Sequence, residues 1–247
     1  MNYKMEITYE GTKYRGWQRL KNSDMTIQGK IEAVLSRFLG VETEINGASR
    51  TDSGVHALCQ LANFKTEMAV DVSELKAYMN QYLPEDICIR NIGAVSESYH
   101  ARFGSKEKVY LYRIWKAEYP SVFERRTVTQ YRGVSLDVEA MKSAAHILEG
   151  EHDFKGFCTD KTKKSTVRKI NAITFSETDE ELKIFVEGNG FLYNMVRIIV
   201  GTLMEVGSGQ RTAESVKRII ETGDRNIAGE TAPPQGLILY KIENSSV

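Results

Sequence analysis

The sequence predicts an α+β fold made of two ferredoxin-like halves around a mainly antiparallel sheet. Segments with alternating apolar residues, typical of half-buried strands, are separated by segments with the i, i+3, i+4, i+7 spacing of amphipathic helices. In the first part of the chain their order is strand-helix-strand-strand-helix-strand, which is that of a ferredoxin-like unit. The second part follows a larger variation of this order, without an internal sequence repeat.

We expect four strands in the first half, at residues 3–9, 43–46, 58–64 and 86–95. An apolar stripe that starts at Ile31 predicts a helix, with Thr26 as its N-cap and Gly40 at its end. A second helix is expected to start at Ser73 as N-cap and to end before Pro84.

In the second half, strands are predicted at residues 108–116, 165–177, 181–188 and 236–241, and helices at 137–150, 191–207 and 213–221. The helix at 191–207 is apolar almost all round, so it must be largely buried. Thr212 is expected to cap the last helix. We place the boundary near residues 102–106, which gives an N-terminal half of 1–103 and a C-terminal half of 104–247.

Composition narrows the class of protein. The 247 residues carry 33 Lys and Arg against 33 Asp and Glu, so nucleic-acid binding would need local basic patches. Three widely spaced cysteines without a CxxC predict reduced, mostly buried thiols. The N-terminus lacks the apolar run of a signal peptide, and no segment approaches the roughly 20 apolar residues of a membrane span. We therefore expect a soluble cytoplasmic protein.

Cofactor motifs are absent from the sequence. The four histidines show no metal-ligand spacing, and the cysteines do not complement them. There is no glycine-rich phosphate loop, nucleophile elbow or dinucleotide fingerprint. We expect a site with no metal and no organic cofactor.

The stretch "GASRTDSGVHA", residues 47–57, concentrates polar groups around Asp52. Gly47 and Gly54 allow a tight backbone path that could aim this side chain into a pocket. An ionised, oriented carboxylate can act as a nucleophile or a base. The alternative is that Asp52 only forms an Asx-turn between two strands.

Arg197 interrupts the apolar run "NMVRIIV". A charged side chain is rarely buried without a partner, because desolvation costs several kcal/mol. One interpretation is a guanidinium that reaches a buried carboxylate, for which Asp52 is the natural candidate. Such a contact would keep that carboxylate ionised at neutral pH. The other is an arginine at a helix edge whose head group extends to solvent.

Tyr110 and Tyr112 share one face of the strand at 108–116. Such a pair is usually core or interface, but it could also provide a surface on which a nucleobase stacks. Two basic runs lie near this strand and in residues 155–169. They are either solvated surface or a local concentration of positive charge for phosphate binding.

The chain resembles the TruA-type tRNA pseudouridine synthases over its whole length. Six segments carry the resemblance in the expected order: "YEGTKYRGWQ" (9–18), "GASRTDSGVHA" (47–57), "YHARFGSKEKVYLYRI" (99–114), "KSTVRKI" (164–170), "GNGFLYNMVRIIVGTLMEVG" (188–207) and "TAPPQGLIL" (231–239). One such segment alone is a weak signal, whereas six in order are highly specific.

The resemblance implies a pseudouridine synthase fold and an isomerase that converts uridine to pseudouridine at positions 38, 39 and 40 of the tRNA anticodon stem-loop. Asp52 corresponds to the catalytic aspartate and Arg197 to its paired arginine. Tyr110 corresponds to the tyrosine that packs against the target base and deprotonates C5. Arg50 corresponds to a basic residue that holds the flipped-out RNA. A homodimer that needs no metal or organic cofactor is implied.

The chain departs from the family pattern "GAGRTDAGVHA" at Ser49 and Ser53, and Lys108-Val109 replaces the usual Arg-Thr. No reacting group is lost, so we expect activity. Two alternatives stay open: a divergent paralogue that acts on another RNA, and a non-catalytic RNA-binding module. A nucleophilic and a glycal route are both compatible with these residues.

Overall fold

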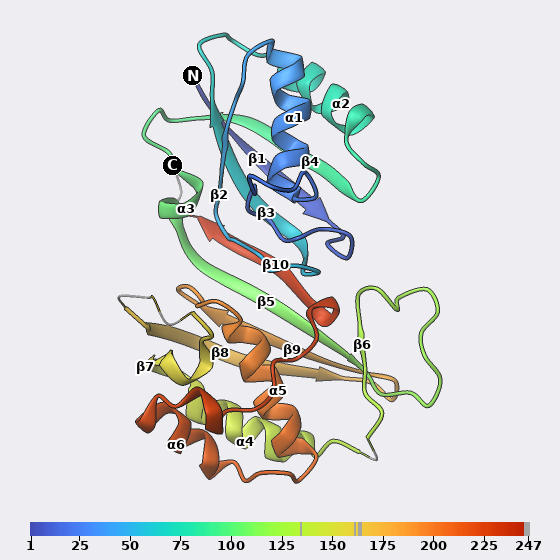
Figure 1. Ribbon diagram of the computed structural model, residues 1–247, viewed down its shortest axis with the longest axis vertical. Coiled ribbons are helices and arrows are strands. Elements are labelled where there is room, and N and C mark those ends of the chain that lie inside the picture. Colours follow the sequence, from blue (N-terminus) through green and yellow to red (C-terminus); the bar gives the residue numbers. More distant parts are fainter. Residues whose placement is uncertain (134, 161, 163–164, 245–247) are drawn as a thin grey trace. The chain divides into compact units, whose positions relative to one another are not determined.

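The structure is a computed structural model that describes residues 1–133, 135–160, 162 and 165–244. Lys161, Lys163 and Lys164 of the second basic run lie outside the described residues. Backbone contacts divide the chain into two compact units (Figure 1). Unit 1 comprises Met1–Lys106 and the strand from Ile238 onward, and unit 2 comprises Glu107–Leu237. The strands pair mostly antiparallel, which confirms the predicted α+β class.

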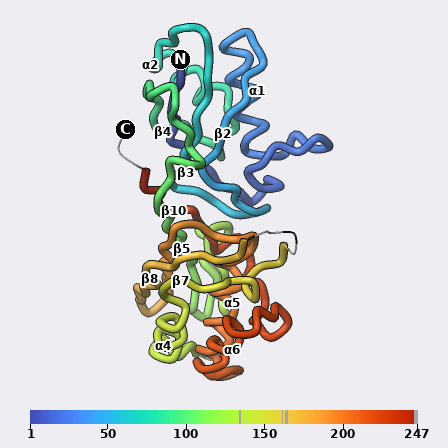
Figure 2. Tube along the Cα trace, turned by 90° about the vertical axis from the view of Figure 1, so that its left-hand side faces the viewer, coloured from blue at the N-terminus to red at the C-terminus, as the bar shows by residue number. Residues whose placement is uncertain are grey.

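Unit 1 begins with the predicted strand-helix-strand-strand-helix-strand order. Its elements are β1 (Asn2–Tyr9), α1 (Ile27–Leu39), β2 (Ile45–Gly47), β3 (His56–Lys65), α2 (Val72–Tyr82) and β4 (Ile87–Val95), followed by the short α3 (Ala101–Gly104). The sheet order is β4-β1-β3, with β2 antiparallel to β3. Both long helices lie on one face of this sheet (Figures 1 and 2).

The core of unit 1 follows the two sequence periods. Every second residue of β1 from Tyr3 onward is buried, and so is one stripe of α1. Ile31 and Leu35 are completely buried, and burial of each such side chain contributes about 1.5–3 kcal/mol. The alternating and helical patterns therefore predicted the inward faces correctly.

The helix ends of unit 1 are capped by side chains. Thr26 Oγ1 accepts the Gly29 N–H at 3.2 Å, and Gly40 adopts a left-handed φ of 71° after α1, as predicted. The prediction of Ser73 as the N-cap of α2 is wrong. The cap is Asp71, whose carboxylate accepts the N–H groups of Ser73 (2.8 Å) and Glu74 (3.1 Å).

In unit 2 the strands pair antiparallel in the order β5-β9-β8-β7, and the short β6 pairs parallel with β5. Its strands are β5 (Ser105–Trp115), β6 (Thr129–Gln130), β7 (Gly150–Asp153), β8 (Val167–Glu177) and β9 (Glu181–Gly188). Its helices are α4 (Val138–Leu148), α5 (Met195–Gly207) and α6 (Glu214–Thr222), with 3-10 turns at Phe154–Phe157, Arg225–Ile227 and Pro234–Gly236. The three α-helices lie together beside this sheet (Figure 1).

Two helix starts in unit 2 differ from prediction. The segment predicted as helical from residue 191 becomes helical only at Met195, because Asn194 has a left-handed φ of 62° that a right-handed helix cannot contain. Thr212 provides no side-chain cap for α6, since Ala213 is the N-cap residue and the Thr212 carbonyl accepts the Ser215 N–H instead.

The last strand, β10 (Leu237–Asn244), pairs parallel with β3 through Ile238–His56 and Leu239–Ala57. Sequence order places this strand in the predicted second half, 104–247, whereas its contacts group it from Ile238 onward with unit 1. Among the described helices, none combines the length and apolar character that a membrane span requires.

The cysteines are less buried than predicted. Only Cys158 is buried, Cys59 is half-buried, and Cys88 is exposed. Cys88 lies on the outward face of β4, between the buried Ile87 and Ile89, where a thiol contacts solvent.

The α2 cap allows a direct test. Asp71→Ala should lower the free energy of unfolding by about 1 kcal/mol, because two N–H groups of the first helical turn lose their acceptor. Ser73→Ala, which leaves that acceptor in place, should change it by less than about 0.5 kcal/mol. Urea denaturation of both variants measures the difference, and an equal effect would contradict the assignment of the cap.

Candidate active site

Arg50 and Asp52 lie in the loop that joins β2 to β3. Arg50 is exposed and Asp52 is partly exposed, whereas Thr51 between them is buried. The loop is attached to its own hairpin at the start: Ala48 N–H donates to the Leu61 carbonyl at 2.8 Å. The buried Gln60 side chain accepts the Ser49 N–H (3.1 Å) and donates to the Ser49 carbonyl (2.7 Å). The backbone that leads to Asp52 is thus held before the loop turns.

The second support of this loop is the segment at residues 10–18. Trp17 N–H donates to the Thr51 carbonyl at 3.1 Å, and Gly54 N–H donates to the Tyr14 carbonyl at 3.2 Å. The Tyr9 and Thr51 hydroxyls share a buried hydrogen bond of 2.8 Å. Asp52 therefore sits between two backbone attachments, one residue before it and two residues after it.

Glycines make this backbone-to-backbone contact possible. A Cβ on Gly11 would lie 2.0 Å from the Val55 carbonyl oxygen, and one on Gly16 would lie 2.7 Å from that of Thr51. Gly16 also has a φ of +94°, a backbone conformation that residues with a side chain rarely adopt. On the other side, a Cβ on Gly47 would overlap the Trp17 indole at 2.4 Å. The approach of the two segments therefore depends on these three positions.

The three departures from the family pattern fit this geometry. The Ser53 hydroxyl donates to the Tyr14 carbonyl at 3.1 Å and adds a further attachment to the turn. Ser49 is buried with its backbone held by Gln60. Val109 lies in regular antiparallel register opposite Glu187. None of them replaces or displaces a candidate reacting group within its unit.

Two titratable neighbours of the loop have structural roles. His56 is buried, and its Nδ1 accepts the Gly11 N–H at 2.9 Å, so this nitrogen carries no proton. Glu10 Oε1 lies 3.7 Å from the same atom. Burial, together with the hydrogen bond that its hydroxyl donates to Asp86, raises the pKa of Tyr14. Tyr14 is therefore neutral at physiological pH.

The two tyrosines of β5 have different environments. Tyr110 is 6% exposed and packs edge-on against Phe191, with ring centroids 5.2 Å apart and planes at 89°. Tyr112 is completely buried, and its hydroxyl contacts Thr129 Oγ1 and the Pro233 carbonyl, each at 2.8 Å. Burial raises the pKa of Tyr112. Tyr112 is thus a core residue and not part of a stacking surface.

Arg197 lies in the first turn of α5 and is half-buried. Its Nε donates to the Ala232 carbonyl at 2.7 Å, and its Nη1 donates to Asn194 Oδ1 at 2.9 Å. The side-chain amide of Asn194 in turn donates to Thr159 Oγ1 at 2.9 Å. The head group is therefore fixed by protein acceptors, which excludes the interpretation of a solvent-directed arginine.

The sequence alone identifies the candidate residues but not the residues that position them. Tyr9, Tyr14, Trp17 and Gln60 hold the loop within unit 1, and Asn194 orients Arg197 within unit 2. A signal for the first group was present in "YEGTKYRGWQ", where glycines and aromatic residues alternate without a helical or strand period. No sequence pattern indicates the role of Gln60, because a polar residue within a strand is common.

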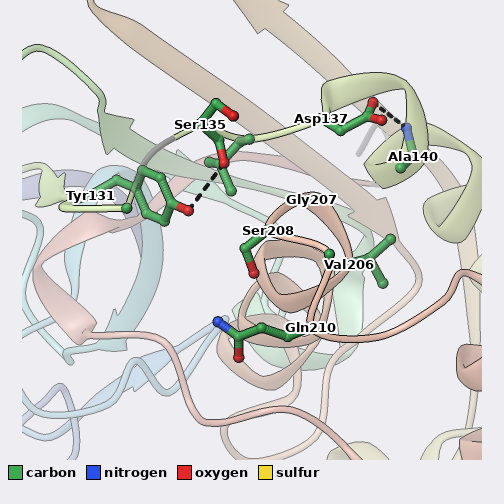
Figure 3. A pocket seen from close by; sticks show the side chains of 11 residues that line it. Tyr131, Ser135, Asp137, Ala140, Val206, Gly207, Ser208 and Gln210 are labelled. Atoms are coloured by element: carbon green, nitrogen blue, oxygen red, sulfur yellow. Dashed lines mark hydrogen bonds between the residues drawn. The ribbon is translucent and has the colours of Figure 1, made fainter.

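One cavity lies beside a candidate residue of the Asp52 loop, and another lies away from all candidate residues. A cavity of about 250 Å³ in unit 1 is lined by Trp17, Gly47 and Arg50 of the two packed loops, and by Phe103. A larger one of about 650 Å³ lies in unit 2 at the C-terminal end of α5 (Figure 3). Its carboxylate, Asp137, caps α4 through the Ala140 N–H at 2.9 Å, and none of the candidate residues lines it.

Gly16 provides a test of the loop contact. Gly16→Ala should lower the free energy of unfolding by at least about 1–3 kcal/mol, because backbone strain at its positive φ adds to the overlap with Thr51. The matched control is Gly93→Ala in β4, where a Cβ meets no atom within 4 Å and no loss is expected. Hydrogen exchange should report faster opening of residues 47–57 in the Gly16 variant alone. Equal protection in both variants would show that the two loops are independent.

Comparison with known proteins places the chain in a family. A family model described as tRNA pseudouridine synthase matches residues 6–104 and 144–243. The tRNA pseudouridine synthase A 2 of Bacillus anthracis is 48% identical over 243 residues, which cover 98% of this chain and 99% of the relative. The tRNA pseudouridine synthase A of Acetivibrio thermocellus is 42% identical over 242 residues, with 98% of each chain covered.

Among solved structures, a chain in the crystal structure of a Cbf5-Nop10-Gar1 complex is similar at 12% identity, with a TM-score of 0.32. The match covers 82% of this chain and 45% of that one, and a likeness of this size adds nothing to the assignment. The family model and the near full-length identities are sufficient: the chain belongs to the tRNA pseudouridine synthase family.

Proposed function

We propose that this protein isomerises uridine to pseudouridine at positions 38, 39 and 40 of the tRNA anticodon stem-loop. The observation that carries the proposal is the Asp52 loop, which backbone hydrogen bonds hold on both sides of the carboxylate. A loop that only connected two strands would not need three glycines to pack it against a second loop. Membership of the tRNA pseudouridine synthase family supports uridine isomerisation as the reaction of this positioned carboxylate.

The reaction needs no redox step. The bond between C1′ and N1 breaks, the uracil ring turns, and a bond forms between C1′ and C5. C5 then loses its proton, and N1 gains one, so the product has the atoms of the substrate. Because the target base must leave the stack, the enzyme has to offset an unstacking cost of a few kcal/mol by contacts with RNA.

Asp52 is proposed to start this sequence. As a carboxylate it would attack C1′ or C6 as a nucleophile, or remove the 2′ proton as a base to form a glycal. Its partial exposure supports access to a substrate, and the attached backbone on either side supports a defined direction of approach. Preorganisation of this kind lowers the reorganisation needed at the moment of reaction.

Arg197 is proposed to pair with Asp52 and to keep it ionised. Nε and Nη1 of this guanidinium already have protein acceptors, so its plane has one orientation. A planar donor that is held in this way suits a carboxylate better than a flexible lysine would. The pairing would lower the pKa of the Asp52 carboxyl through the opposite charge.

Tyr110 and Arg50 are proposed to act on the base and on the RNA. Phe191 fixes the Tyr110 ring, which would pack against the uracil and place the phenol oxygen near C5 as the base for deprotonation. Arg50 is exposed on the same loop as Asp52, where it would hold the flipped-out configuration of the RNA. We also infer a cytoplasmic homodimer that needs no metal or organic cofactor, as in the family it resembles.

Tritium release from C5 of labelled uridine in unmodified tRNA tests the proposal. The wild type should release tritium, and Asp52→Ala should lower the rate by roughly 10²–10⁴-fold or more while tRNA binding persists. Ser53→Ala is the matched control, because it removes only a hydroxyl at the neighbouring position and should keep turnover close to that of the wild type. Binding without release by the wild type would point to another RNA substrate, and equal release by the wild type and Asp52→Ala would remove Asp52 from the mechanism.

The tyrosines of β5 give a second, separate test. Tyr110→Phe keeps the ring contact with Phe191 and should reduce turnover by roughly 10²–10⁴-fold. Tyr112→Phe should do the reverse, with turnover retained and a loss of about 1 kcal/mol in the free energy of unfolding, because Thr129 and Pro233 lose a buried partner. Single-turnover kinetics and urea denaturation separate the two effects, and a turnover defect in both variants would contradict the division of roles.

A further inference from the structure

The cavity of about 250 Å³ in unit 1 combines features of a nucleotide-binding groove. One wall belongs to the two packed loops and includes Trp17 and Arg50. The rest of its lining includes His100, Arg102 and Phe103, which belong to α3 and the residue before it. The lining thus includes Arg50, two residues from Asp52 in sequence, and the aromatic ring of Phe103.

Phe103 is unusual among the aromatic residues of unit 1, because 80% of it is exposed. Its ring is not loose: the His100 ring packs against it with centroids 4.5 Å apart and planes at 44°. Nδ1 of His100 also accepts the Arg102 N–H at 3.2 Å, which fixes the histidine. The phenyl ring is therefore supported by the His100 ring, lines the groove and is mostly exposed to solvent.

The charge of the groove favours an anion next to this ring. Arg19 and Glu44 also line the groove, and ion pairs of Arg19 with Glu32 (3.1 Å), Glu42 (3.8 Å) and Glu44 leave no net positive charge there. Arg50 and Arg102 are exposed, and no carboxylate of the described residues lies within ion-pair distance of either guanidinium. Two uncompensated arginines beside an exposed ring match the phosphate and the base of a single nucleotide.

We propose that this groove binds one unpaired nucleotide of the RNA substrate beside the target uridine, with its base stacked on Phe103 and its phosphate between Arg50 and Arg102. The inference rests on the proposed function and deepens it, because it assigns a binding residue outside the reacting groups. Phe103 positions the RNA and takes no part in the chemistry. Since the target base is drawn out of the stack, a neighbouring base on Phe103 would keep the loop in the opened conformation.

Phe103 variants test the stacking directly. Phe103→Ala and Phe103→Leu should each weaken the binding of unmodified tRNA by roughly 5- to 100-fold, with turnover at saturating tRNA nearly unchanged. Phe103→Tyr keeps an aromatic ring and should bind like the wild type. Phe123→Ala is the matched control, because Phe123 is 97% exposed but does not line the groove. The high exposure of both positions makes a folding defect easy to exclude by thermal denaturation.

A stem-loop RNA with one abasic nucleotide identifies the base in the groove. With each position next to the target made abasic in turn, one position should weaken binding to the wild type but not to Phe103→Ala. Equal binding by the Phe103 and Phe123 alanine variants would overturn the proposal. Equally tight tRNA binding by Phe103→Leu and Phe103→Tyr would overturn it as well. So would a result in which every abasic RNA binds the wild type and Phe103→Ala with the same relative loss of affinity.

The failure of this inference differs from that of the proposed function. A wild type that releases no tritium but loses RNA binding on Phe103→Ala contradicts the proposed reaction and supports the groove. A wild type that releases tritium, with Phe103→Ala equal to Phe123→Ala in binding, supports the reaction and overturns the groove.

Discussion

The contact between residues 10–18 and residues 47–57 is the constraint on which the site in unit 1 depends. Two backbone hydrogen bonds join Thr51 to Trp17 and Gly54 to Tyr14, and they leave Asp52 between them. Such a contact buries N–H and C=O groups that would otherwise need water, so it contributes to stability while it orients the loop. It is possible only because glycines at 11, 16 and 47 remove the side chains that would separate the backbones.

In unit 2 a different device positions Arg197. The left-handed Asn194 delays the start of α5 and turns its own side chain to both Arg197 and Thr159. A non-glycine residue with positive φ costs of order 1–3 kcal/mol and persists only where its surroundings stabilise it. The strained Asn194 is also the residue that orients Arg197, a charged side chain in a helix whose other residues are mostly apolar and buried.

A polar network connects three residues that line the groove, Arg19, Gln28 and Ile45, to the buried Glu32. The buried Glu32 carboxylate on α1 accepts the Ile45 N–H at 2.9 Å and a Gln28 N–H at 2.8 Å, and it pairs with Arg19. The buried Glu32 side chain thereby joins α1, β2 and the loop that carries Arg19, and it neutralises the charge of Arg19. The positive charge that is left at the rim belongs to arginines near Asp52 and Phe103, which links the packing of the unit to the kind of ligand that it attracts.

The sequence by itself determined the periodic elements and the candidate residues. Alternation and the helical stripe predicted most long strands and helices, because burial of one face acts on every residue of the element. Short pieces such as β6, β7 and α3 were not predicted, since two to four residues carry no period. The residue types around Asp52, together with the resemblance, predicted a catalytic role for this loop. Only the tertiary structure decided which residues hold Asp52, Tyr110 and Arg197, because partners such as Tyr9 and Thr51 lie far apart in sequence and meet only through the register of β1 on β3. For Phe103, His100 and Arg102 are neighbours in sequence, whereas its exposure and the shared groove with Arg50 arise only in the tertiary structure.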